Sequence, residues 1–497
     1  MSDPDGWSRQ IPGWVSPQGA PLGYSANTFP SGSSSATAKK RRWWGWALAL
    51  FLVAVVVTTS CVWFVIHDRN STNAVAEVFG TPESLFLSER MDRQPVPGWS
   101  LKIADAISAD VESIALIGSY GDTAVFKSYD RQDAVPPMTR VFAVNVVRGE
   151  LLSAALALPK TDDCWLNGPP VVLCISGTSP TSGAPDPQAW VIDTSTGQML
   201  HTGPTDMRFL SSKRKVKQVG QYAVEAVNDV GVYGIGRSAE HTWFVAGEGI
   251  ISAGGGFSPD VPPPVLTDQD AQSEIVFSVV DGRVKTPTPR VPGDRSSKAQ
   301  SSTTGMAVLM KAENGSNYVT VIDNDGSVTG TFNPQVSGGA VDLDISSRET
   351  PIVRIGTADS SRWIPISSTG RALLTIPSES LTTEFRTIGH RLLVAPQSIS
   401  GGTNDTWYQY DLRSGQKLST CVVPYLVSSH GASAAQSSYV GFDGTTVVTS
   451  AGKAVATNLD TCNQQQWEFG WDSNFSKVNR TLVKYDRDTI SSLVAPK

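Results

Sequence analysis

The stretch from Lys39 to Ile66 constrains this chain more than any other. The 24 residues from Trp43 to Ile66 include no charged residue. An apolar helix of about 20 residues crosses a hydrocarbon core roughly 30 Å thick, so this run is long enough to span a membrane. Four basic residues stand directly before it: Lys39, Lys40, Arg41 and Arg42. Such a cluster predicts a cytoplasmic N-terminus, a single-pass anchor in the cell membrane and an extracytoplasmic C-terminal part.

Two other interpretations of this run are weaker. A secretory signal peptide has a short charged region before an apolar core of about 7 to 15 residues, whereas 42 residues precede this longer run. A lipid anchor on Cys61 is the second alternative, because residues 57–61 faintly resemble a lipobox. However, Thr58 stands where that motif usually has Leu or Val, and the apolar run continues to Ile66. We therefore interpret 43–66 as a transmembrane helix and Cys61 as a small apolar side chain within it.

Composition divides the remaining chain. Residues 1–42 are rich in Ser, Gly, Pro and Ala without periodicity, which predicts a disordered cytoplasmic tail. Residues 67–97 are expected to form a stalk or linker, and 98–497 an extracytoplasmic domain. Up to Arg42 there are five basic and two acidic residues, and the rest of the chain has 35 basic and 44 acidic. An acidic domain with no basic stripe predicts that nucleic acid is not a partner.

From about Trp99 the pattern predicts an all-β domain. Short runs of β-branched and aromatic residues alternate with Gly, Asp and Ser, and no long amphipathic helix is evident. Six segments share one form, an apolar strand, a turn ending in glycine and a second apolar strand. Their turn glycines are Gly149, Gly197, Gly249, Gly326, Gly370 and Gly415, at steps of 48, 52, 77, 44 and 45 residues. A period of 40 to 50 residues is typical of four-stranded propeller blades.

The number of blades follows from these hairpins. The step of 77 residues includes a Pro-rich stretch at 258–267 and a polar stretch at 286–304, which we interpret as loop insertions into one blade. A further set of strands is expected at 438–442, 445–449 and 453–459. The sequence thus predicts a β-propeller of about seven four-stranded blades, with six or eight possible.

The best repeats carry a resemblance to a known family. Asp193 to Leu200 and Asp411 to Leu418 read Asp-x-x-(Ser/Thr)-Gly-(Gln/Lys)-x-Leu, which resembles the repeat of quinoprotein-type (PQQ-like) β-propellers. The whole arrangement is similar to single-pass actinobacterial membrane proteins with such a domain. The resemblance implies the fold, and it raises a PQQ- and calcium-dependent dehydrogenase as an alternative function. The chain lacks the adjacent-cysteine disulfide and regular Trp motif of those enzymes, so no catalytic residue, cofactor or metal ligand is predicted.

Four cysteines lie outside the predicted membrane span. Cys164 and Cys174 flank residues 168–170, Gly-Pro-Pro, and a hairpin there would bring them to cross-strand distance, where a disulfide can close. That pairing leaves Cys421 for Cys462. Free thiols and a metal site are the alternatives, but no Cys-x-x-Cys occurs and no histidine adjoins a cysteine.

These observations favour one functional class over another. The absence of a catalytic constellation predicts a binding or scaffold module of the cell envelope. Its ligand, a protein or an envelope polymer, is expected on a loop face formed by insertions within 254–304. The alternative is an oxidoreductase that uses the propeller channel. Propellers host both classes, so the fold alone does not choose between them.

Overall fold

The computed structural model describes most of the chain after residue 78. The described ranges are 79–107, 111–130, 137–159, 161, 163–176, 187–205, 207, 214–253, 265–270, 273–334, 340–344, 349–357, 360–377, 383–396, 406–426 and 439–497. The chain divides into two units, Met1–Ala74 and Val75–Lys497, and every described residue belongs to the second. The predicted tail, the predicted span at 43–66 and its basic flank lie outside the described residues. Within the described ranges, no helix is both long and apolar enough to cross a membrane.

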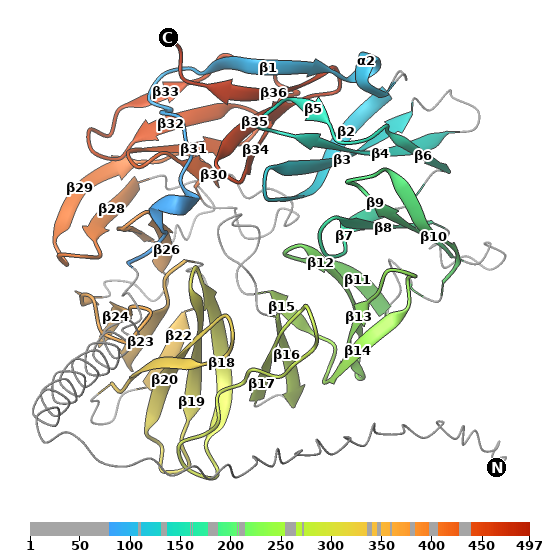
Figure 1. The fold of residues 1–497 in the computed structure, drawn as a ribbon. Helices are drawn as coiled ribbons and strands as arrows, with labels where there is room; N and C mark the ends of the chain where they lie inside the picture. Colours follow the sequence, from blue (N-terminus) through green and yellow to red (C-terminus); the bar gives the residue numbers. More distant parts are fainter. Residues whose placement is uncertain are drawn as a thin grey trace, which may run out of the picture. The chain divides into compact units, whose positions relative to one another are not determined.

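The described residues form nine antiparallel sheets, here called blades 1 to 9 (Figure 1). Blade 1 contains β2 (Val111–Tyr120), β3 (Thr123–Asp130), β4 (Met138–Asn145), β5 (Glu150–Leu151) and β6 (Leu156–Pro159). Blade 2 contains β7 (Asp163–Leu166), β8 (Val171–Ser176), β9 (Gln188–Asp193) and β10 (Gln198–Pro204). Blade 3 contains β11 (Arg214–Val219), β12 (Tyr222–Val227), β13 (Gly231–Ile235) and β14 (His241–Ala246). Blade 4 contains β15 (Ile251–Ala253), β16 (Val265–Asp270) and β17 (Ser273–Phe277).

The second half of the ring follows the same plan. Blade 5 contains β18 (Arg295–Ser302), β19 (Gly305–Lys311), β20 (Asn317–Asp323) and β21 (Val328–Phe332). Blade 6 contains β22 (Ala340–Asp344), β23 (Ile352–Thr357), β24 (Ser360–Pro365) and β25 (Ile376–Pro377). Blade 7 contains β26 (Thr383–Ile388), β27 (Arg391–Pro396), β28 (Thr406–Asp411) and β29 (Lys417–Val422). Blade 8 contains β30 (Tyr439–Phe442), β31 (Thr446–Ser450), β32 (Ala454–Asn458) and β33 (Gln464–Gln466).

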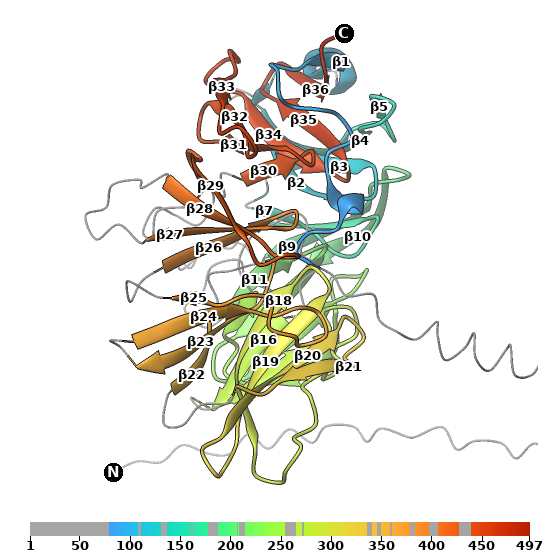
Figure 2. The ribbon, with the colours of Figure 1, turned by 90° about the vertical axis from the view of Figure 1, so that its left-hand side faces the viewer.

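Blade 9 joins the two ends of this unit. It contains β34 (Asn474–Val478), β35 (Thr481–Tyr485), β36 (Thr489–Val494) and β1 (Val96–Lys102). Strand β1 pairs with β36, with Val96 opposite Val494, and both views show the two strands side by side (Figures 1 and 2). The short helices are η1 (Glu83–Leu85) and α2 (Ile103–Ile107). An N-terminal strand therefore completes a blade made otherwise from C-terminal residues.

Hydrophobic contacts between neighbouring blades close the sheets into a circular order. Each of nine buried clusters in the described residues joins two consecutive blades. The cluster containing Phe126, Phe142 and Ile490 joins blade 9 to blade 1. Strands that are apolar on both faces are expected where every sheet packs between two others. Contacts between consecutive blades include the first-strand pairs β2 with β7, β18 with β22 and β30 with β34, so the first strands lie at the inner perimeter.

One turn recurs between the third and fourth strands. In blade 2, Asp193 Oδ1 accepts N–H bonds from Ser195 and Thr196, and the Gly197 N–H donates to the Asp193 carbonyl at 2.8 Å. Gly197 has φ +69°, a left-handed conformation that glycine adopts without a steric penalty. Blades 1 and 7 repeat this geometry at Asn145–Gly149 and Asp411–Gly415. Side-chain capping by Asx residues explains the Asp-x-x-x-Gly signature.

The prediction of about seven blades is wrong, since the described residues form nine. The sequence predicts a hairpin turn at Gly249, but β14 before it pairs with β13 and β15 after it pairs with β16. The turn that belongs to the repeat is Ser278 to Gly282 in blade 4, where the Gly282 N–H donates to the Ser278 carbonyl. The 77-residue interval between Gly249 and Gly326 therefore contains an additional blade, blade 4, rather than a loop insertion. The repeat pattern also missed blade 9, because its fourth strand, β1, is distant in sequence from the other three.

The predicted stalk at 67–97 is also corrected for its described part. Residues 79–95 lie against the turns between first and second strands. Thr303 Oγ1 of blade 5 donates to the Gly80 carbonyl at 3.0 Å, and the Thr81 N–H donates to Gly389 of blade 7. Farther along, the Leu87 N–H donates to Phe442 of blade 8. Leu87 and Met91 are buried between blades 8 and 9, and the boundary predicted at residue 98 lies inside β1.

Candidate functional site

Both predicted cysteine pairs are disulfides in the structure. Cys164 and Cys174 are directly opposite on β7 and β8, with Cα atoms 4.1 Å apart. Both are buried in the cluster between blades 1 and 2. The Gly-Pro-Pro segment at 168–170 forms the intervening turn, as the sequence predicts. This bond links the two inner strands of blade 2.

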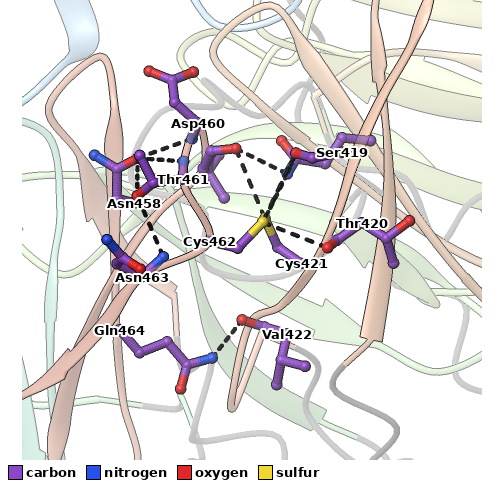
Figure 3. Close-up of a disulfide and its surroundings, with 12 residues drawn as sticks. Ser419, Thr420, Cys421, Val422, Asn458, Asp460, Thr461, Cys462, Asn463 and Gln464 are labelled. Atoms are coloured by element: carbon purple, nitrogen blue, oxygen red, sulfur yellow. Dashed lines mark hydrogen bonds between the residues drawn. A yellow bond between two sulfur atoms is a disulfide. The ribbon is translucent and has the colours of Figure 1, made fainter.

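The second disulfide joins two blades (Figure 3). Cys421 lies on β29 of blade 7 and Cys462 in the turn after β32 of blade 8, with Cα atoms 5.1 Å apart. Cys462 has φ +60° and donates its N–H to the Asn458 carbonyl at 2.8 Å. It therefore occupies the position that glycine holds in the other turns. Gln464 Nε2 adds a bond to the Val422 carbonyl across the same boundary.

Part of the predicted loop face at 254–304 is regular structure, because β16, β17 and β18 lie within it. Residues 254–264 lie outside the described part of the chain. The loop predicted at 286–304 is present at 286–294, but residues 295–302 form β18, the inner strand of blade 5. Ser296, Gln300 and Ser301 on that strand are buried. The polar composition of this stretch predicts a loop. The polar side chains are nevertheless buried, because the strand pairs with β19 and they take part in interstrand hydrogen bonds.

Within the described ranges, blade 4 has three strands, whereas the other blades have four or five. A short stretch replaces the outer strand: Val284 forms a bridge with Phe277, and the Lys285 N–H donates to the Val276 carbonyl at 2.7 Å. Thr286 Oγ1 accepts from the Val276 N–H. This stretch pairs only with the C-terminal end of β17.

A groove lies where the outer strand of blade 4 is short. The cavity has a volume of about 450 Å³ and is bounded by the 244–246 segment of β14, the 273–275 segment of β17 and by Val284, Thr286 and Ser296. We call it the blade-4 groove. Apolar side chains on its margin are exposed to solvent, with Phe244 at 47% and Val284 at 62%. Val280 and Ile250 are also exposed on the neighbouring turns. Clustered exposed apolar residues are typical of protein interaction surfaces.

Aromatic stacking holds Phe244 in place. Its ring lies 4.7 Å from that of Tyr233, which stacks on His241 with ring centroids 4.4 Å apart. His241 Nε2 lies 2.8 Å from Oε2 of Glu225, a fully buried carboxylate with Arg214 4.0 Å away. The Glu225 contact fixes the imidazole, and the stack extends that order to the margin of the groove. The exposed ring is therefore preorganised for contact.

Gly282 shapes the other side of the groove. Its φ is +70°, and a Cβ atom there would approach the Trp243 ring to 2.8 Å. Trp243 also packs edge to face on Phe277 of blade 4. The glycine pattern in the sequence missed Gly282, which is the turn glycine of blade 4. The segment Ile275 to Val284, an apolar strand followed by Asp-Gly, carried the signal that could have identified it.

Asp323 has a structural role in the β20–β21 turn, where its Oδ1 accepts N–H bonds from Asp325 and Ser327. Among the described residues, no three His, Cys, Asp or Glu side chains are grouped to hold a metal ion.

The chain is similar to a protein family, to a relative and to solved structures. The model of the conjugation-associated 9-bladed β-propeller domain matches residues 71–496. An uncharacterised protein of Mycolicibacterium smegmatis strain MKD8 is 28% identical over 484 residues, which cover 90% of this chain and 95% of the relative. Among solved structures, BamB from Moraxella catarrhalis is 10% identical, with 80% of this chain and 99% of that chain covered and a TM-score of 0.33. A eukaryotic initiation factor is 12% identical, with coverages of 73% and 89% and a TM-score of 0.42.

Proposed function

Because this chain belongs to the conjugation-associated nine-bladed β-propeller family, we propose that it is a membrane-anchored, extracytoplasmic binding module of the conjugation apparatus. The apolar run at 43–66 supplies the anchor, and the basic residues before it place the propeller outside the cytoplasm. The ligand is a protein segment held in the blade-4 groove. An envelope polymer on the same face is the other ligand that the sequence suggested.

The observation that carries this proposal is the exposed apolar margin of the groove. Phe244 offers a large aromatic surface at low entropic cost because its ring is already stacked on Tyr233. A cavity of about 450 Å³ beside an anchored aromatic ring suits an apolar side chain of a partner. The lining is mixed, since Ser273, Glu274, Thr286 and Ser296 lie beside the apolar side chains. A protein is the ligand proposed because clustered exposed apolar residues are typical of protein interaction surfaces.

A photo-crosslinking experiment tests the proposal. Phe244 is replaced by p-benzoylphenylalanine in the full chain, and cells are irradiated during conjugation. The control carries the same residue at Trp471, an aromatic side chain in the connection between β33 and β34 that is 72% exposed. We expect a discrete protein adduct from position 244 and none from 471. Equal labelling from the two positions, or no adduct at 244 while transfer proceeds, would contradict the proposal.

A genetic measurement provides a second test of the proposal. Phe244→Ser removes the exposed ring and should lower the frequency of conjugation, because central aromatic contacts contribute about 2 kcal/mol or more to protein interfaces. Trp471→Ser is the matched control and should leave the frequency unchanged. Both side chains are exposed, so both variants are expected to keep the fold.

A further inference from the structure

Two lysines on the inner strand of blade 3 form a second candidate surface, away from the blade-4 groove. Strand β11 reads Arg-Lys-Val-Lys-Gln-Val, and its side chains alternate between two neighbours. Val216 lies in the core shared with blade 2, and Gln218 Oε1 accepts the Leu166 N–H of that blade at 2.9 Å. Val219 lies in the core shared with blade 4. Lys215 and Lys217 have the same parity as Val219, so they face blade 4 at the inner perimeter.

Other inner-strand cations have partners within the molecule. Lys298 of β18 lies 3.1 Å from Asp342 of β22, and Arg386 of β26 lies 3.9 Å from Glu349. Lys477 of β34 donates to the Leu85 carbonyl. In the described ranges, neither Lys215 nor Lys217 contacts a carboxylate. The adjacent inner strand β15 reads Ile-Ser-Ala and provides no charge.

Among the described residues these two cations have no carboxylate partner, and they are close enough for the charge of Lys215 to act on Lys217. Burial lowers the pKa of Lys217, and the positive charge of Lys215 lowers that pKa further. Lys215 itself is exposed to solvent. An anion placed between them would relieve their repulsion and replace water lost by the half-buried Lys217.

We propose that Lys215 and Lys217 bind two carboxylates of an extended acidic segment from a partner protein. Residues i and i+2 of a strand are about 6.6 Å apart, so acidic side chains at alternate positions of an extended peptide match the two lysines. A short acidic segment fits better than a nucleic acid. The chain after Arg42 has 44 acidic and 35 basic residues, and this excess repels a long polyanion beyond the two lysines.

A binding titration tests this proposal. The full chain is purified in detergent and titrated with a fluorescein-labelled peptide of alternating Ser and Glu; a Ser-Gln peptide of equal length is the comparison. We expect the Glu peptide alone to bind, with affinity that falls as salt rises from about 50 to 500 mM because screening shortens the range of the charges. Lys215→Gln with Lys217→Gln should weaken binding about tenfold.

Matched controls make each outcome decisive. Lys102→Gln with Lys311→Gln removes the same charge from exposed sites on β1 and β19, and should leave the affinity unchanged. Near-ultraviolet circular dichroism verifies that both double variants fold. Equal weakening in both would overturn the proposal, as would tighter binding of a single-stranded oligonucleotide that depends on the same lysines. Phe244→Ser should not change peptide binding, so this result and the crosslinking result fail independently.

Discussion

Cutting the link between blades 7 and 8 provides the sharpest test of how this ring is held together. The Cys421–Cys462 disulfide spans a sequence separation of 41 residues. The chain-entropy estimate for a loop of that length is about 4 kcal/mol of stabilisation. Replacing both cysteines removes this contribution. The cost should be concentrated at the blade boundary, because each blade contacts its two neighbours through separate clusters.

Two versions of the change separate the crosslink from the backbone. Cys462 adopts φ +60°, where a residue with a Cβ atom costs about 1 kcal/mol or more relative to glycine. We therefore expect Cys421→Ala with Cys462→Gly to be more stable than Cys421→Ala with Cys462→Ala by about 1 kcal/mol. Both should be less stable than the natural chain.

Hydrogen exchange followed by mass spectrometry reads this effect locally. Peptides covering β28 and β29 should exchange at least about tenfold faster in both variants, since each 1.4 kcal/mol corresponds to a factor of ten. Peptides covering β9 and β10 of blade 2 are the internal control and should change little. A uniform increase around the ring, or a glycine variant no more stable than the alanine variant, would refute the reasoning.

Three further perturbations follow from the fold. Burial alone would raise the pKa of Asp193, but hydrogen bonds from Ser195 and Thr196 lower it, so its stabilisation is present above about pH 4 and lost as the pH falls further. Asp193→Asn keeps the cap, because Asn145 caps the same turn in blade 1. The melting temperature of this variant should fall less between pH 5 and 3 than that of the natural chain, and an equal fall would contradict this. Gly282→Val should destabilise blade 4, because the added Cβ would clash with the Trp243 ring and φ is +70°. Faster hydrogen exchange of β17 would measure this loss. Gly315→Val is the control, since φ there is also positive but a Cβ meets open space. Deleting 96–102 should unfold blade 9 and expose the 474–494 segment to protease; persistent resistance there would argue against ring closure by β1.

Local features of the sequence predicted local structure well. The alternation of apolar residues and the Asp-x-x-x-Gly turns identify hairpins because strand pairing and side-chain capping there involve residues close in the chain. The Cys164–Cys174 pair follows from the same locality, since a short hairpin places the two residues opposite each other. The run at 43–66 constrains the chain through hydrophobic length alone, and it stays a prediction.

Only the tertiary structure decided the number of blades and the shape of the candidate sites. Pairing of Val96 with Val494 depends on the whole chain closing into a circle, and no sequence period encodes a strand supplied from the other end. The groove exists because blade 4 ends early beside β14, and the environment of Lys217 depends on which blade its strand faces. These features arise from contacts between residues distant in sequence, where packing of neighbouring blades determines which side chains are buried, paired or left exposed.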